Sequence, residues 1–167
     1  MVLRRAKESD KSTIWDILQF AIAQRKAEGS DQWQDGYPNL QSIETDLVNE
    51  HAYVLEENGT ILLYSAIIFG DDPAYKEIDG AWKTDQPYVV LHRVAVSQIA
   101  KGKGIATSFF KLVEELAIQN NYFSIRVDTN FDNIAMLRIL EKLGYHYCGE
   151  VQMRGGVRKA FEKVLGS

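Results

Sequence analysis

Cysteine is almost absent from this 167-residue sequence, which contains only Cys148. A lone cysteine cannot form a disulfide within the chain, and the sequence has no CxxC pair. The N-terminal stretch MVLRRAKESD also lacks the apolar segment of a secretory signal peptide. We therefore expect a reducing, cytoplasmic location.

Long apolar runs are missing as well. No segment approaches the roughly 20 apolar residues that a membrane-spanning helix requires, so no membrane partner is expected. The formal net charge is −4, whereas proteins that bind the nucleic-acid backbone are more often basic overall. The sequence therefore predicts no nucleic-acid partner, and it predicts no metal site.

Internal repeats, low-complexity tracts and Pro- or Gly-rich linkers are also absent. Hydrophobic residues make up 46% of the sequence, and the length suits one buried core better than two. We expect a single domain over residues 1–167.

What the sequence does contain is a glycine turn between a strand pattern and a helix pattern. The apolar stretch VVLHRVAV leads through a short polar bend into KGKGIAT and then into an amphipathic helix. Gly102 and Gly104 permit a sharp turn, which leaves the first N–H groups of the helix unpaired. Those N–H groups, the positive end of the helix, and the side chains of Lys101 and Lys103 are suited to bind phosphate.

Two common phosphate-binding motifs do not fit this turn. It lacks the GK[ST] ending of a nucleoside-triphosphate P-loop, and it is not GxGxxG. By itself it is also compatible with a plain strand-to-helix turn.

The rest of the chain predicts alternating strands and helices. The pair Asn58-Gly59 favours a two-residue hairpin turn, because both positions need positive φ. The predicted strands cover residues 2–6, 52–57, 60–69, 89–96, 123–127, 145–153 and 157–164. The predicted helices run from Ser9 or Asp10 to Gly29, over residues 40–50, from the glycine turn to about Asn120, and from Asn133 to Gly144.

This order resembles the GCN5-related N-acetyltransferase (GNAT) family over essentially the whole chain. The family loop reads Arg/Gln-x-x-Gly-x-Gly/Ala. Gly104 and Ala106 fill its last two marked positions, while Lys101 stands where Arg or Gln is usual. The resemblance implies an α/β (α+β) fold with a mixed, mostly antiparallel sheet of about six to seven strands and about four helices. Strands 4 and 5 of that family fold splay apart.

The resemblance also implies acetyl-CoA as the cofactor. The cofactor-binding residues that it implies are Val94, Ala95, Val96, Lys101, Gly102, Lys103, Gly104, Ile105, Ala106, Thr107 and Asn133. Backbone groups of Val94 and Val96 would meet the pantetheine arm, with the Val94 N–H near the thioester oxygen. Core packing of this strand and helix capping by Asn133 are the plain structural alternatives.

His92 is the candidate catalytic residue. Strand side chains alternate, so residues 90, 92, 94 and 96 are expected on one face unless a bulge intervenes, with Arg93 on the other. A neutral imidazole can take a proton from an ammonium group. The segment LHRVAV resembles the strand of arylalkylamine N-acetyltransferases, where a basic histidine holds the matching position. A purely structural histidine is the alternative.

The usual general acid of the family is missing. Its last helix commonly carries a tyrosine where this sequence has Leu140. A CoA thiol has a pKa of roughly 8.5, so its thiolate can leave without an obligatory acid. Tyr88, Tyr145 and Cys148 are further candidates near the thioester. We expect Cys148 to be a buried structural thiol, since a nucleophilic cysteine would imply a ping-pong route that this fold does not need.

Two loops are candidates for binding the acceptor. Trp33 and Tyr37 can wall a pocket in SDQWQDGYPN, where Asp31 or Asp35 can hold a cation, and Tyr88 is a further contact. The segment 70–87 has five acidic and two basic side chains, a local charge of −3 that favours a cationic amine. Solvated charge and aromatic packing explain both loops equally well.

The sequence thus predicts an acetyl-CoA-dependent N-acetyltransferase that acts on a small-molecule or peptide amine, as a monomer or homodimer. Direct attack in a ternary complex is the expected route. The alternatives are a non-catalytic acyl-CoA-binding module, prompted by the missing tyrosine, and a domain that binds another phosphate ligand at the glycine turn.

Overall fold

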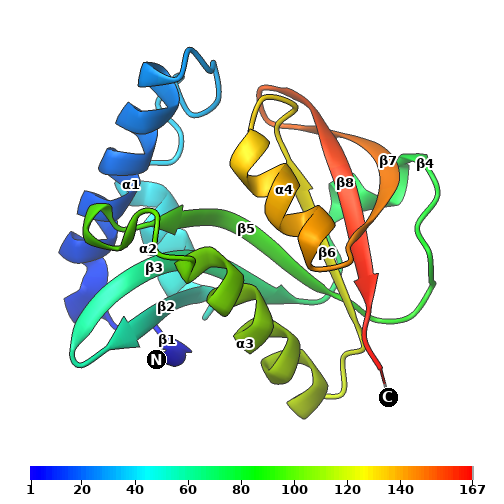
Figure 1. Cartoon of the computed structure of the whole chain (residues 1–167), viewed down its shortest axis with the longest axis horizontal. Coiled ribbons are helices and arrows are strands. Elements are labelled where there is room, and N and C mark those ends of the chain that lie inside the picture. The colour runs from blue at the N-terminus through cyan, green and yellow to red at the C-terminus, as the bar shows by residue number, and fades with distance from the viewer. Residues whose placement is uncertain (167) are drawn as a thin grey trace. The chain divides into compact units, whose positions relative to one another are not determined.

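The computed structural model describes residues 1–166 and contains eight strands and four α-helices in that span (Figure 1). The strands are β1 (Val2–Arg5), β2 (Ala52–Glu57), β3 (Thr60–Phe69), β4 (Asp79–Gly80), β5 (Val89–Val96), β6 (Ser124–Thr129), β7 (His146–Met153) and β8 (Gly156–Val164). The helices are α1 (Lys11–Ala27), α2 (Leu40–Val48), α3 (Ile105–Gln119) and α4 (Ile134–Lys142), with short 3₁₀ helices η1 (Glu8–Asp10), η2 (Pro73–Glu77) and η3 (Gln98–Ala100).

The described chain forms two compact units. Unit 1 comprises Met1–Ile67 and Arg93–Phe109, and unit 2 comprises Ile68–His92 and the chain from Phe110 onward. Strands β3 and β5 and helix α3 each contribute residues to both units.

Unit 1 is built on strands in the order β1-β2-β3-β5. The β2–β3 hairpin turns at Asn58 and Gly59, with φ of 51° and 81°. Both values are positive, as a type I′ turn requires, so the predicted hairpin is confirmed.

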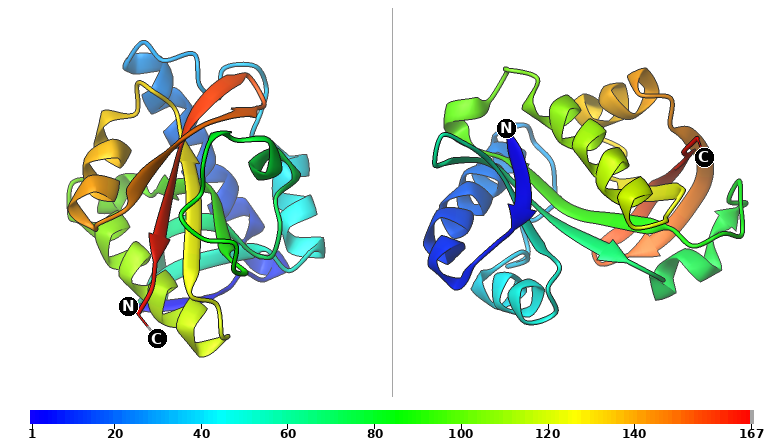
Figure 2. Two further views of the ribbon diagram at one scale, coloured as in Figure 1. Left: turned by 90° about the vertical axis from the view of Figure 1, so that its right-hand side faces the viewer. Right: turned by 90° about the horizontal axis from the view of Figure 1, so that it is seen from below.

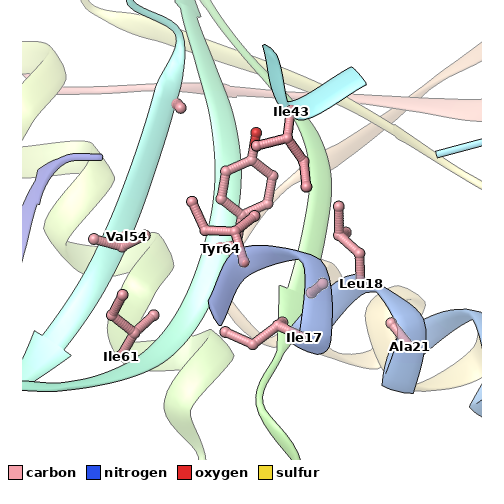
Figure 3. Close-up of a cluster of buried hydrophobic side chains, with 10 residues drawn as sticks. Ile17, Leu18, Ala21, Ile43, Val54, Ile61 and Tyr64 are labelled. Carbon is pink, nitrogen blue, oxygen red and sulfur yellow. The ribbon is translucent and has the colours of Figure 1, made fainter. Parts of the chain in front are cut away.

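Helices α1 and α2 bury their apolar sides against the strands of unit 1. Figure 3 shows Leu18 from α1 and Ile43 from α2 in a cluster with Val54 of β2 and Tyr64 of β3. All four side chains are fully buried. The 3.6-residue spacing of apolar positions on α1 places them on one stripe, which explains why this helix packs as it does.

Unit 2 has the strand order β3-β5-β6-β8-β7-β4. Strand β5 pairs in parallel with β6 from Val89↔Ile125 to Leu91↔Val127. The other ladders, β6–β8, β8–β7 and β7–β4, are antiparallel. Figure 2 (left) shows β6 in yellow beside β8 in red. The mixed, mostly antiparallel sheet confirms the fold class that the resemblance implied.

The segment 70–87 is more structured than its sequence suggested. It forms η2 and the two-residue strand β4, which brings the strand count to eight. At the β4–β7 contact a Cβ on Gly80 would lie 2.2 Å from the carbonyl oxygen of Cys148. Only glycine permits this approach of two backbones.

Tyr75 from this segment and Tyr88, which follows it, lie in a core of unit 2. Tyr75, Tyr88 and Val90 are buried together with Val151 of β7 and Ala160 of β8. The ring centre of Tyr75 in this core lies 6.1 Å from that of His92.

Candidate functional site

The glycine turn has the predicted geometry. Gly102 and Gly104 have φ of 78° and 71°, and open space lies within 4 Å of a Cβ built on either. The Gly104 carbonyl accepts the Ser108 N–H at 3.2 Å, the first bond of α3. The N–H groups of Ile105, Ala106 and Thr107 therefore precede the bonded turns of the helix and point away from it.

The charges around this turn are exposed. Lys101 and Lys103 are both solvent-accessible, and Ile105 is buried as the anchor of the helix. Backbone donors, a positive helix end and two mobile ammonium groups thus lie on one exposed bend of unit 1, an arrangement suited to a phosphate ester.

Strand β5 has an irregular backbone at Arg93, whose φ is 55°. A positive φ in a non-glycine residue breaks the two-residue alternation, so the expectation that residues 90, 92, 94 and 96 share one face does not hold beyond Arg93. Val90 and His92 both lie beside Tyr75 in unit 2, which agrees with the expectation up to that point. Val94 and Val96 are half-buried, and Ala95 packs in the core of unit 1.

The side chain of Arg93 joins a buried network in unit 1. Its Nη2 donates to Asp46 Oδ1 at 2.6 Å, and its Nε donates to Asp46 Oδ2 at 3.0 Å. Asp46 is 3% exposed and also accepts from the Tyr64 hydroxyl. The third contact of Arg93 is a bond from Nη1 to the Tyr37 hydroxyl at 2.5 Å.

The two aromatic residues of the predicted acceptor loop therefore have identified partners. Tyr37 is held by Arg93, and Trp33 packs against the core of unit 1 with the Arg25 guanidinium 5.5 Å from its ring centre. Both remain half-buried. Their predicted role as walls of an acceptor pocket stays a prediction.

His92 lies between two carboxylates in unit 2. Its Nε2 is 2.7 Å from Asp72 Oδ2, and its Nδ1 is 3.6 Å from Asp128 Oδ1. The side chains of the three residues are only 10% to 15% exposed. Two acidic groups so near a single imidazole give the cluster a negative charge whether or not the ring is protonated.

Tyrosine hydroxyls contact both acidic residues, Asp128 through its carboxylate and Asp72 through its backbone N–H. The Tyr75 hydroxyl donates to Asp128 Oδ1 at 2.6 Å, and the Asp72 N–H donates to the Tyr88 hydroxyl at 3.1 Å. Burial, followed by the neighbouring charge of Asp128, raises the pKa of Tyr75 well above its ordinary value. Tyr75 is therefore a permanent donor. Tyr88, predicted to contact substrate, is 6% exposed and reaches the cluster by holding Asp72.

The remaining candidates have structural surroundings. Asn133 is the N-cap of α4, and its side chain accepts the Met136 N–H at 3.3 Å. Leu140 is fully buried at the position where the family usually has a tyrosine. Tyr145 is buried, and burial raises its pKa well above the ordinary value. Burial also raises the pKa of the Cys148 thiol, as does the charge of Glu162. Cys148 is therefore a poor nucleophile, as expected.

A hollow of about 540 Å³ opens elsewhere in unit 1, next to the β2–β3 hairpin and Ser97–Ile99. Its basic lining residue, Arg4, is engaged with Asp10 at 2.8 Å and with Glu56 at 2.9 Å. None of the residues predicted for the site lines it.

Within residues 1–166, no three or more His, Cys, Asp or Glu side chains are grouped so as to hold a metal ion. In the same span, no helix combines the length and the apolar character needed to cross a bilayer.

Sequence reasoning missed three residues beside His92. Asp72 was counted only among the five acidic side chains of segment 70–87, for which solvated charge was an equal alternative, and neither Tyr75 nor Asp128 was singled out. The signal available was the three-residue spacing of Asp72 and Tyr75 around Pro73, which favours a short helical turn with Asp72 as its cap.

Comparison with solved structures gives relatives of the whole chain. A GNAT-family acetyltransferase from Streptococcus agalactiae is 36% identical, with a TM-score of 0.91, over 99% of this chain and 96% of that one. A Salmonella typhimurium protein solved with acetyl-CoA is 16% identical, with a TM-score of 0.70, over 100% of this chain and 95% of that one. This second likeness shows the fold alone.

Comparison with curated proteins gives a partial match. N-acetylaspartate synthetase of Danio rerio is 26% identical over 127 residues, which are 74% of this chain. The matched region is 44% of that protein, so the chain spans less than half of this relative. The model of the acetyltransferase (GNAT) family matches residues 15–145. With the glycine turn, the mixed sheet and a family match over most of its length, the chain belongs to the acetyltransferase (GNAT) family.

Proposed function

We propose that this protein transfers the acetyl group of acetyl-CoA to a primary amine by direct attack in a ternary complex. The observation that carries the proposal is His92, a candidate base held between Asp72 and Asp128 on a strand that leads to the glycine turn. Family membership supplies the reaction class, and these residues supply a way to perform it.

The glycine turn is the proposed site of the CoA pyrophosphate. The first N–H groups of α3 donate to its oxygens, and Lys101 and Lys103 add positive charge. Bound there, the cofactor supplies a thioester whose carbonyl carbon accepts the amine. The backbone N–H of Val94, two residues beyond His92, is the proposed donor to the carbonyl oxygen, and Asn133 is proposed to contact the pantetheine side.

The proposed base step removes one proton from the acceptor ammonium to His92. The free amine attacks the thioester carbon, the carbon–sulfur bond breaks, and the CoA thiolate leaves. The second proton of the attacking nitrogen goes to that thiolate, and His92 returns its own proton to solvent. The buried Cys148 thiol supports this route over an acyl-enzyme at that residue, because a group with a raised pKa is rarely a thiolate.

The proposed acceptor is a cationic amine. Asp72 and Asp128 make the surroundings of His92 negative, which favours an acceptor with an ammonium group over an anionic acceptor. Trp33 and Tyr37 are proposed to contact the rest of the acceptor. Tyr88 is proposed to hold Asp72 in place through the backbone N–H of that residue. The name of the Danio rerio relative specifies acetylation of aspartate, also through its amine, but that acceptor carries two carboxylates.

Release of CoA thiol from acetyl-CoA tests this proposal. We expect the rate to rise above hydrolysis with members of a panel of primary amines, and to be faster with diamines than with aspartate. Acetyl-CoA binding without thiol release for any amine would instead support the non-catalytic acyl-CoA-binding module. The buried Leu140 in place of the usual tyrosine is the observation that favours this alternative.

We further propose that residues 1–167 act as one acetyltransferase domain, as a monomer or homodimer in the cytoplasm. The family match from residue 15 to 145 includes residues of both units, and β3, β5 and α3 contribute to both.

A further inference from the structure

One short segment of unit 2 determines what lies beside both ring nitrogens of His92. Asp72 contacts Nε2, and Tyr75, three residues later, donates to the Asp128 carboxylate that faces Nδ1. The intervening Pro73 begins η2, whose turn sets the spacing of these two side chains.

Asp72 is fixed in place by three separate contacts. Its backbone N–H donates to the Tyr88 hydroxyl at 3.1 Å, its Oδ1 accepts the Ala74 N–H at 2.9 Å, and its Oδ2 lies 2.7 Å from His92 Nε2. An ionised carboxylate can only accept hydrogen bonds. The proton shared in the last contact therefore belongs to Nε2.

Asp128 has a different relation to the ring. Its Oδ1 accepts from the buried Tyr75 hydroxyl, and the 3.6 Å separation from His92 Nδ1 is too long for a hydrogen bond. It is short enough for a carboxylate to stabilise a positive charge that forms on the ring. The two carboxylates thus act on the two nitrogens in different ways.

We infer that Asp72 is a positioning residue that holds His92 in the Nε2–H tautomer, so that Nδ1 is the nitrogen that takes the proton from the acceptor amine. This inference rests on the proposed function. When Nδ1 receives that proton, Nε2–H remains bonded to Asp72, and Asp128 lies beside the new imidazolium charge. A carboxylate that fixes a tautomer plays a comparable part in the serine-protease triad.

The replacement Asp72→Asn tests the inference, since an asparagine still caps η2 through its oxygen but presents an amide donor to Nε2. That donor favours the opposite tautomer, in which Nδ1 carries the proton. We expect kcat/KM to fall roughly 100-fold with acetyl-CoA affinity unchanged. Asp72→Ser, which keeps a capping hydroxyl and loses the carboxylate, should lose activity as well. Glu115→Gln is the control, because that exposed carboxylate of α3 lies outside the segment 70–87 and outside the proposed site.

Two readouts separate this role from a structural one. Nitrogen-15 correlation spectra should show Nε2–H in the native protein and Nδ1–H in Asp72→Asn, independently of any activity. In the His92→Gln background, Asp72→Asn should cause no further loss, because the two residues act as one unit.

The inference is overturned by an Nδ1–H tautomer in the native protein, by full activity of Asp72→Asn, or by multiplicative losses in the double variant. Failure of the proposed function looks different. His92→Gln would then be fully active while the spectra still showed the Nε2–H tautomer held by Asp72.

Discussion

At the scale of single residues, Glu162 is the clearest case of a buried charge that the fold has to satisfy. Its carboxylate, fully buried in unit 2, accepts from the Lys83 N–H, the Ser124 hydroxyl and Arg126 Nε at 2.6, 2.6 and 3.2 Å. Burial alone would raise its pKa, but the hydrogen bond from Ser124 and the charge of Arg126 outweigh it, so the pKa lies below the ordinary 4.5.

A lowered pKa makes this group a source of pH-dependent stability. Glu162→Gln should reduce the free energy of unfolding by about 2 kcal/mol at pH 7, since it leaves Arg126 without its buried partner. The stabilisation is complete above pH 4.5 and is lost as pH falls through the lower folded-state pKa. Denaturant melts at several pH values should show the gap between wild type and variant narrowing below that pH. A constant gap would mean that the carboxylate charge contributes nothing.

His92 gives a second prediction at this scale. A base must be neutral to accept a proton, so kcat/KM should rise with pH and level off once the ring is deprotonated. His92→Gln should lower kcat roughly 100-fold and abolish the part of the pH dependence that comes from this ring, while CoA binding persists. The two profiles need the same acceptor, because ionisation of the amine also raises the rate at higher pH. Near-full activity with an unchanged profile would leave His92 a structural residue.

At the scale of elements, the turn before α3 can be tested by adding a side chain. Gly104→Asp places a negative charge beside the proposed pyrophosphate site at a φ of 71°. We expect calorimetric titration to show loss of CoA binding. Gly59→Asp is the control, because Gly59 has a similar φ of 81° and the same open surroundings but lies in the β2–β3 turn. Retention of CoA affinity in a folded Gly104→Asp protein would refute the assignment of this turn.

The link between α2 and β5 in unit 1 gives another prediction. Arg93→Ala should cost about 3 kcal/mol of stability, because it leaves the Asp46 carboxylate buried without its cation. Asp46→Ala should cost a similar amount, and the double variant much less than the sum. Additive losses in urea melts would show that the pair is not coupled.

Local patterns predicted those elements whose signal lies within a few residues. The pair Asn58-Gly59 located the β2–β3 hairpin, and Gly102 with Gly104 located the start of α3. In the segment 70–87 the only such signal was the Asp72-Pro73 start of η2. Strand β4 depends on contacts with distant residues, such as Gly80 against Gly149, and sequence spacing does not reveal them.

At the scale of the whole molecule, ligand binding should be visible as stability. CoA at about 100 times its dissociation constant should add ~2.7 kcal/mol to the free energy of unfolding. In a chain of this size that corresponds to roughly 5–10 °C in melting temperature. Scanning calorimetry with CoA, ATP and NAD checks this, and we expect the shift with CoA alone. A larger shift with ATP would favour the alternative that the glycine turn binds a phosphate ligand other than CoA.

As with the fold, the sequence predicted the parts of the site that have a local signal and missed those that depend on distant contacts. Sequence alone nominated His92 and the glycine turn, because both lie in one continuous motif. It could not find Asp72 and Asp128, which lie 20 residues before and 36 residues after His92, because nothing in a single sequence tells which of its 23 acidic residues turn inward. Their inward position follows from the burial of Tyr75 and Tyr88, which hold them.

The left-handed backbone at Arg93 also constrains the register in which β5 pairs with its neighbouring strands. If β5 slipped by one residue in one direction, the β-branched Val94 would have to adopt the positive φ, which is far more costly for such a residue than for arginine. A slip in the other direction would put His92 there and carry its ring away from Asp72. Both shifts would also separate the guanidinium from Asp46. The irregular backbone at Arg93 costs about 1 kcal/mol, but it helps to specify the register of β5, because every shifted register has a higher free energy than the native one.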